Sequence, residues 1–274
     1  MALGWFGATG RLAADPVRPA PKFVAGGQAD QEEGRRALQE FRSAGLAGDY
    51  WLDFELRVMP HRGEETMLRG QILGTRGDQG PVTRLSVQTP GGGTAWLIQG
   101  GPQPDARVST AGGPVRAVSA AETLAPVAGT DLTLFDLQMP FLYWDDFVYE
   151  GLANIRGRPA YSLILYPPAA FAAQRPELAA VRVALDTQFH ALVQAEQLGP
   201  KGEALKSITV LDLKKTDGQW IVKTIDLRNA VTRDKTRFNV TAAALGLTLP
   251  PGAFEAASLS QPAPAPDPAK VERF

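Results

Sequence analysis

The clearest pattern in the chain is a strict alternation of hydrophobic and polar residues over Tyr50–Val58. A period of two is that of a β-strand, because successive side chains point to opposite faces of a sheet. We therefore expect a strand with one apolar face and one face in water. The apolar face would carry Tyr50, Leu52, Phe54, Leu56 and Val58.

Short β-rich runs separated by turn residues fill much of the remaining chain. Asp217-Gly218 lies between two of them, and Asp-Gly is a strong hairpin signal because both residues tolerate positive φ. Connections this short join antiparallel neighbours, since a parallel pair needs a crossover of about a dozen residues or more. Besides Tyr50–Val58, the expected strands are Thr66–Leu73, Val82–Gln88, Thr94–Gln99, Arg107–Thr110, Pro114–Val118, Phe147–Arg156, Ala160–Tyr166, Val181–Leu185, His190–Gln197, Ser207–Leu213, Trp220–Leu227 and Thr236–Thr241.

Helices are few and short. Asp30 can cap a helix, and Glu33 three positions later would complete a capping box. The helix predicted over Asp30–Arg42 has Ala37, Leu38 and Phe41 on one face, so it can lie on a sheet. The sequence thus predicts a mainly β (α+β) fold with an antiparallel sheet and two or three helices. Shorter helical pieces are expected at Ala120–Ala128, Asp131–Leu137 and Ala169–Ala173, and Thr133 with Asp136 would form a capping box in the second of them.

Motifs in the second half of the chain occur in a characteristic order. They are Arg158–Pro167 (R-P-x-Y-x-L-x-L-x-P), Gly202 and Lys206 (G-x-x-x-K), Asp217, Gly218 and Trp220 (D-G-x-W), Thr232 and Thr236 (T-x-x-x-T), and Leu249, Pro250 and Phe254 (L-P-x-x-x-F). Together they resemble the carboxy-terminal half of bacterial outer-membrane lipoprotein-sorting proteins, the LolA/LolB-like superfamily. The resemblance covers about residues 130–254. It implies a strongly curved antiparallel sheet, an incomplete barrel closed by helices, which holds acyl chains in its concave apolar space.

Composition narrows the function further. The net charge is −1, which argues against a nucleic-acid binder that neutralises phosphates. The chain has no cysteine and two isolated histidines, so neither a thiolate site nor a histidine metal site is expected, and no cofactor is implied. No apolar run is long enough for a transmembrane span. We expect that the protein is not an enzyme. The alternative is a hydrolase, which a converging set of Ser, His and Asp side chains would support.

Three segments are expected along the chain. Residues 1–28 would be a signal remnant or a disordered leader, since Leu12-Ala13-Ala14 resembles the end of a secretory signal. Residues 29–257 would form a single LolA/LolB-like domain. Residues 258–274, rich in proline and alanine, would be a disordered tail. The leader and the resemblance together predict a soluble periplasmic, extracytoplasmic protein.

The resemblance favours a cavity over a filled core, and we expect it between the helix Asp30–Arg42 and the concave sheet face. The aromatic segment Phe141–Phe147 would lie at its mouth. The ligand would be a lipid acyl chain or an acylated lipoprotein, held without catalysis. The alternative is a sensor or assembly module of the same fold that binds an envelope protein. The expected lining residues are Leu38, Phe41, Leu52, Phe54, Leu56, Phe141, Tyr143, Trp144, Phe147, Tyr161, Leu163 and Leu165.

Overall fold

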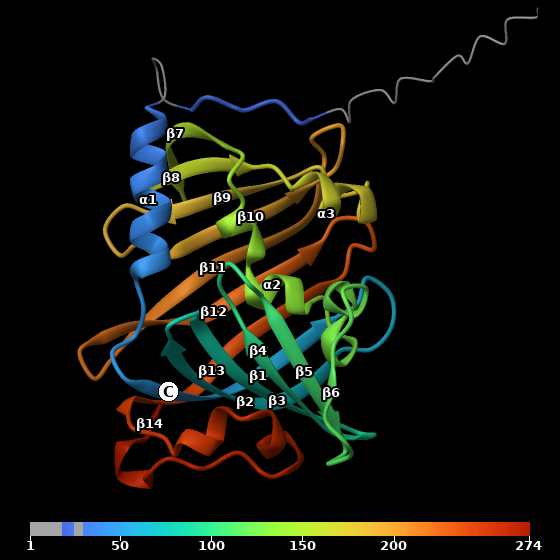
Figure 1. Cartoon of the computed structure of the whole chain (residues 1–274), viewed down its shortest axis with the longest axis vertical. Helices are drawn as coiled ribbons and strands as arrows, with labels where there is room; N and C mark the ends of the chain where they lie inside the picture. The colour runs from blue at the N-terminus through green and yellow to red at the C-terminus, as the bar shows by residue number, and fades with distance from the viewer. Residues whose placement is uncertain (1–17, 25–29) are drawn as a thin grey trace, which may run out of the picture.

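The computed structural model describes residues 18–24 and 30–274. Leu12-Ala13-Ala14 therefore lies outside the described residues. The core of the fold is one antiparallel sheet in the order β6-β5-β4-β3-β2-β1-β13-β12-β11-β10-β9-β8-β7, with β14 paired to β13 (Figure 1). The strands are β1 Asp49–Met59, β2 Thr66–Gly77, β3 Gly80–Thr89, β4 Gly92–Gln99, β5 Asp105–Thr110, β6 Arg116–Ala117, β7 Phe147–Ile155, β8 Arg158–Leu165, β9 Ala180–Asp186, β10 Leu192–Leu198, β11 Ala204–Thr216, β12 Gln219–Asn229, β13 Lys235–Leu247 and β14 Glu272–Arg273.

The predicted fold class is confirmed: the structure is mainly β, and its curved sheet is not closed into a barrel. Register shifts interrupt the ladders between β1 and β13, between β11 and β12, and between β7 and β8. An extra residue in one strand bends that strand and increases its twist, so these bulges help the long sheet to curve.

The predicted hairpin at Asp217-Gly218 is confirmed. Both residues have positive φ, 46° and 76°, as a two-residue type I′ turn requires. The turn sets the pairing of β11 with β12, which runs from Lys206 opposite Asn229 to Thr216 opposite Gln219.

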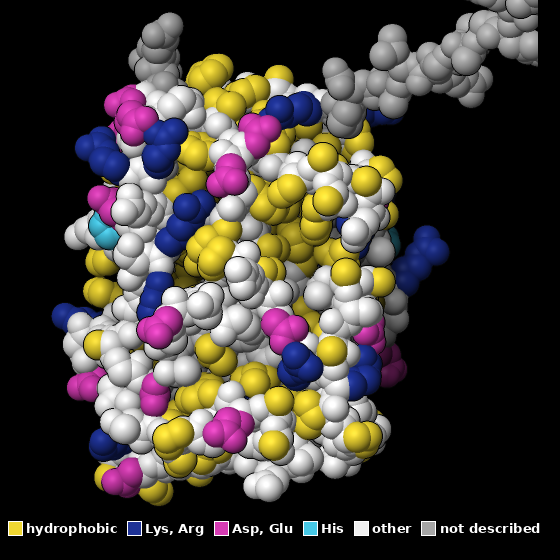
Figure 2. Space-filling model, in the orientation of Figure 1, with side chains coloured by type: hydrophobic (Ala, Val, Ile, Leu, Met, Phe, Trp, Pro, Cys, Tyr) yellow, Lys and Arg dark blue, Asp and Glu magenta, His cyan; other side chains and the backbone are white. Residues whose placement is uncertain are grey.

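The α-helices are α1 (Gln31–Ser43), α2 (Leu134–Gln138) and α3 (Ala169–Gln174). Asp30 caps α1, and its side chain accepts a hydrogen bond from the backbone N–H of Glu32. Helix α1 crosses β7 and β8 on the concave side, while α2 lies between the β7–β10 and β1–β5 parts of the sheet (Figure 1). On the face in Figure 2, hydrophobic side chains gather between α1 and α3, and Lys and Arg side chains stand along α1.

The convex side of β1 differs from the expectation of a face in water. Trp51 is 5% exposed and packs with Leu247, Phe254 and Val271. Its cover is the carboxy-terminal segment Pro251–Phe274, which contains three short 3-10 helices and β14.

The prediction of a disordered tail over residues 258–274 was therefore wrong, and Arg84 of β3 shows why. This arginine is 1% exposed, and its guanidinium donates to the backbone oxygens of Ser258 and Gln261. A proline-rich segment has no periodic pattern of its own, but it can lie extended on a face that is already formed. Those partners become visible only in the folded chain.

Residues 18–24 cover another part of the convex side. The hydroxyl of Tyr166 donates to the backbone oxygen of Pro19, and the backbone N–H of Lys22 donates to Glu150. Ser162 of β8 also lies on this side, and its hydroxyl donates to the carboxylate of Glu150. It is nevertheless buried, because this segment lies over it.

Candidate functional site

A cavity of about 570 Å³ opens on the concave side of the sheet. Its walls come from β1, β2 and β3 on one side and from β11, β12 and β13 on the other. The end of α1 and the segment around α2 complete it. Most of the side chains that line it are hydrophobic, and representatives from different walls are Leu52, Ile72, Leu137, Ile208, Ile225 and Phe238.

Two aromatic side chains of β1 form part of this wall, and glycines of β2 make room for them. A Cβ at Gly70 would be only 2.4 Å from the ring of Phe54, so a larger residue there would clash with this ring. The ring of Tyr50 lies even closer to the Cβ position of Gly74. Burial raises the pKa of Tyr50, although a hydrogen bond with Thr83 acts in the opposite direction. The β1–β2 wall therefore presents flat, uncharged rings to the cavity.

The structure places the twelve expected lining residues in two groups. Five of them line the cavity: Phe41, Leu52, Phe54, Phe141 and Tyr143. The other seven do not, and all of them pack in the hydrophobic cores; they are Leu38, Leu56, Trp144, Phe147, Tyr161, Leu163 and Leu165.

The division follows from how α1 packs. Gly34 lies directly against Tyr149 of β7, and a Cβ at that glycine would be 2.6 Å from the Cβ of Tyr149. Leu38 and Leu163 are almost fully buried in the same core. The body of α1 thus leaves no room above β7 and β8, and from this helix only Phe41 and Arg42 contribute to the cavity.

The inner wall is a short segment, Asp131–Met139, which we call the α2 bridge because it crosses the concave face between β4–β5 and β10–β13. Side chains hold it at three places. The hydroxyl of Thr236 donates to the carboxylate of Asp131 at 2.9 Å. The amide of Gln138 donates to the backbone oxygens of Gln99 and Asp105. The third attachment is Asp136.

Asp136 is the one carboxylate among the residues that line the cavity. It closes the capping box that Thr133 and Asp136 were expected to form, and its two bonds from Thr133 are 2.9 and 2.7 Å long. Gln197 donates to its other oxygen at 2.8 Å, and Lys206 forms a buried ion pair with it. A carboxylate with these four bonds from three residues is fully used in holding the bridge.

Two motif residues thereby acquire a structural role. Lys206 of the G-x-x-x-K motif and Thr236 of the T-x-x-x-T motif both bind the α2 bridge. The spacing of the motifs showed turns and strands, but it gave no sign of Asp131 or Asp136 as partners, because these carboxylates lie 105 and 70 residues away in the chain.

Polar and aromatic side chains surround the outer part of the cavity. Arg42 at the end of α1 donates to the backbone oxygen of Leu142 at 2.7 Å, and its guanidinium lies over the ring of Tyr143. Burial lowers the pKa of Arg42, an effect that Tyr143 and Asp145 oppose. Arg76 of β2 donates to the backbone oxygens of Arg42 and Ala44.

Other lining residues were not anticipated at all. Phe189 in the β9–β10 turn and Trp220 on β12 lie 5.6 Å apart by ring centroids, and the side chain of Trp220 is half exposed. The alternation of hydrophobic and polar residues in β11–β13 could have indicated Ile208, Ile225 and Phe238. The two arginines carry no such signal in the sequence.

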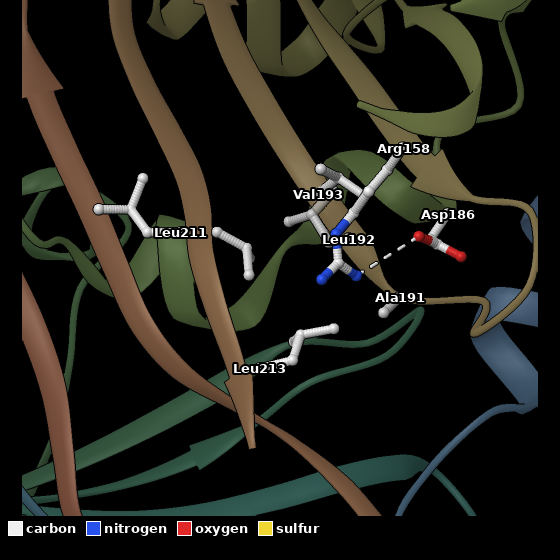
Figure 3. A pocket seen from close by; sticks show the side chains of 8 residues that line it. Arg158, Asp186, Ala191, Leu192, Val193, Leu211 and Leu213 are labelled. Carbon is white, nitrogen blue, oxygen red and sulfur yellow. Dashed lines mark ion pairs between the residues drawn. The ribbon is translucent and has the colours of Figure 1, made fainter. Parts of the chain in front are cut away.

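A second, much smaller cavity lies beside β10 and β11 (Figure 3). Arg158 and Asp186 point toward each other across it, with an ion-pair distance of 3.8 Å. It forms because β10 pairs with β11 only up to Thr209, while β11 continues to Thr216. Its volume of about 10 Å³ is room for at most one water molecule, so it is not a ligand site.

Within residues 18–24 and 30–274, no group of three or more His, Cys, Asp or Glu side chains could hold a metal ion. In the same residues, no helix is long and apolar enough to cross a membrane.

Comparisons with known proteins agree on the fold. A family model described as an uncharacterized protein matches residues 111–261, more than half of the chain. No curated protein matches the chain. Among solved structures, a DUF1329 family protein from Desulfovibrio piger is similar with a TM-score of 0.72 and 17% identity, covering 83% of this chain and 98% of that one.

Two further solved structures are similar to this chain at comparable identities. A putative outer membrane lipoprotein-sorting protein domain from Vibrio parahaemolyticus has a TM-score of 0.71 and 18% identity, covering 85% of this chain and 100% of that one. A LolA superfamily protein from Nitrosomonas europaea has a TM-score of 0.58 and 16% identity, covering 81% of this chain and 96% of that one. At these identities, the likeness shows the fold.

Proposed function

We propose that this chain is a carrier or chaperone that holds an acyl chain. The chain belongs to the family of uncharacterized proteins whose model matches residues 111–261, and the chain has the LolA-like fold. The cargo is a lipid or an acylated protein, and it is held without catalysis in an extracytoplasmic compartment, the periplasm. The observation that carries the proposal is the cavity of about 570 Å³ with its largely hydrophobic wall.

The energetics of such a cavity suit an acyl chain. Each methylene group removed from water contributes about 0.8 kcal/mol, and this contribution does not depend on directional contacts. Side chains such as Leu52, Ile225 and Phe238 supply the apolar surface on opposite walls. A chain that slides between two such walls can be bound firmly and released without breaking specific bonds.

The character of the polar groups in the cavity supports a carrier over an enzyme. A general base needs a carboxylate or imidazole that is free to take a proton at the substrate. Asp136 is occupied by Lys206, Gln197 and Thr133. His190 lies at the outer part of the cavity, and the described residues that line the cavity include no serine or cysteine that it could activate.

The first test is displacement of a fluorescent fatty acid from the purified protein. Ile225→Trp places a large ring into the cavity from the β12 wall, and we expect it to weaken binding at least tenfold. Leu152→Trp is the matched control, because Leu152 is 48% exposed on β7 and does not line the cavity. Both variants are first compared with the parent by thermal melting.

The alternative function is a module of the same fold that binds an envelope protein. If the parent protein binds no fluorescent fatty acid, and native mass spectrometry after gentle purification from a bacterial envelope finds no lipid, the carrier proposal fails in favour of this module. Equal binding by a normally folded Ile225→Trp variant would place the ligand elsewhere.

A further inference from the structure

The size of the cavity limits the number of chains that it can hold. A dry apolar cavity of about 150 Å³ accommodates one benzene molecule, so a volume of about 570 Å³ accommodates roughly 20 carbon atoms. This corresponds to one long acyl chain. A second chain of the same length has no room in the structure as it stands.

The inner end of the cavity offers nothing to a polar head group. Asp136 is the acidic side chain there, and its hydrogen bonds from Thr133, Gln197 and Lys206 leave its carboxyl oxygens fully paired. The neighbouring Gln138 uses its amide N–H groups on two backbone oxygens of β4 and β5. A head group placed there would have to displace bonds that hold the α2 bridge, so the methyl end of a chain belongs at this wall.

The outer end of the cavity carries positive charge that no carboxylate of the described residues neutralises by an ion pair. The lining residues Arg42 and Arg76 donate to backbone oxygens, which are neutral. Neither arginine forms an ion pair with any residue that the structure describes. Two guanidinium groups therefore lie at the carboxy-terminal end of α1, beside the cavity, and no ion pair with a described carboxylate neutralises them.

The acidic groups near this end do not cancel that charge. Asp145 is close enough to raise the pKa of Arg42, but it does not approach it within ion-pair distance. Glu40 lies 3.3 Å from the imidazole of His190 and forms no ion pair with Arg42 or Arg76. The charged side chains that line this end of the cavity are thus cationic.

We propose that the cavity takes a single-chain amphiphile with an anionic head group, a carboxylate or a phosphate, and that Arg42 and Arg76 bind this head. The proposal rests on the carrier function and adds its ligand class. Guanidinium groups suit both heads, since their planar N–H donors match carboxylate and phosphate oxygens. The acyl chain then runs inward between the β1–β2 wall and the β11–β13 wall toward the α2 bridge.

The test compares four probes with the same chain: palmitate, hexadecyl phosphate, neutral monopalmitoyl glycerol and cationic hexadecyltrimethylammonium. Each displaces the same fluorescent fatty acid, below its micellar concentration, from the full chain. We expect palmitate and hexadecyl phosphate to bind about tenfold or more tightly than the neutral probe, because a charge-assisted hydrogen bond is worth that much. The cationic probe binds weakest.

Variants then assign the preference to the two arginines. In Arg42→Gln and Arg76→Gln the advantage of the anionic probes over monopalmitoyl glycerol falls by about tenfold, while binding of the neutral probe itself changes little. Arg42→Lys and Arg76→Lys keep part of the advantage because they keep the charge. Arg36→Gln is the control, since Arg36 is an exposed arginine of α1 that does not line the cavity.

The outcomes separate the two proposals. If the parent binds palmitate and monopalmitoyl glycerol equally, or if both glutamine variants keep the full anionic preference, the head-group assignment is overturned and the carrier function stands. If the parent binds none of the four probes, the carrier function itself fails, and the head-group assignment fails with it. A mass measurement of the complex that finds two chains per protein would overturn the single-chain part.

Discussion

The concave face of the sheet is divided into a closed part and an open part. Above β7 and β8, α1 packs so closely that a glycine is needed at residue 34, and Leu38 and Leu163 are excluded from water. Between β1–β3 and β11–β13, no helix of the described residues 18–24 and 30–274 fills the space, and a cavity of about 570 Å³ remains. The same kind of apolar strand face thus becomes core in one place and binding surface in another, depending on what covers it.

The α2 bridge forms the inner wall of the open part. A helix of five residues has little stability of its own, so its position depends on bonds to the sheet. Those bonds come from polar side chains of β10, β11 and β13, which are the strands that also form the cavity wall. The cavity is therefore maintained by buried polar contacts, whereas the closed part is maintained by apolar packing.

The largest expected effect tests the polar side of this comparison. Lys206→Met leaves the buried carboxylate of Asp136 without its cation, and breaking a buried pair in this way costs about 3–5 kcal/mol of unfolding free energy. Chemical denaturation measures the loss. Lys201→Met, at an exposed turn residue, is the control and should stay close to the parent.

The double variant Lys206→Met with Asp136→Leu sharpens this prediction. Removing both charges relieves the unpaired carboxylate, so much of the lost stability should return even though the bridge loses its attachment. Fatty-acid binding should be impaired in the double variant, because the α2 bridge that forms the inner wall has lost this attachment. If Lys206→Met alone unfolds at the same denaturant concentration as the parent, the polar attachment does not maintain this part of the fold.

The second effect tests the apolar side. Gly34→Val forces two methyl groups toward Tyr149, and overpacking of this kind costs about 1–3 kcal/mol. Gly77→Ala is the control, since a Cβ at Gly77 would have no atom within 4 Å. In the open part, Ile225→Trp should cost less than Gly34→Val. Equal losses in melting temperature for these two variants would mean that the cavity is no more tolerant than the closed core.

The smallest effect concerns the sheet edge beside the open part. Hydrogen bonds from Arg116 and from Ser119 lower the pKa of Glu122 from 4.5 to about 2. A carboxyl group whose pKa is lower in the folded than in the unfolded state stabilises the fold at pH values above its unfolded pKa. For Glu122, this stabilisation is lost as the pH falls from about 4.5 to about 2. The pair is on the surface, so the effect is small.

Glu122→Gln should therefore flatten the acid limb of the stability curve below pH about 4.5 and leave fatty-acid binding unchanged. Thermal melting across this pH range measures it, and Glu64→Gln is an exposed control. An acid limb identical to that of the parent would show that Glu122 gains nothing from Arg116 in solution.

Much of the fold was predictable, because its signals are local. The alternation over Tyr50–Val58 became β1, Asp217-Gly218 became a type I′ turn, and Thr133 with Asp136 became a capping box. The candidate site was predictable only in part. Phe41, Leu52 and Phe54 line the cavity, whereas Leu163 and Leu165 point to the same concave side but lie beneath a helix.

The sequence by itself determined the strands, the turns, the helix starts and the antiparallel order of neighbours, since side-chain period and turn chemistry act over a few residues. Only the tertiary structure decided where α1 would come to rest, that Lys206 and Thr236 would hold Asp136 and Asp131, and that Arg84 would bind the carboxy-terminal segment. These contacts join residues far apart in the chain, and a hydrophobic pattern shows which side of a strand avoids water without showing what covers it. Whether an apolar face becomes core or cavity is settled by packing between distant segments.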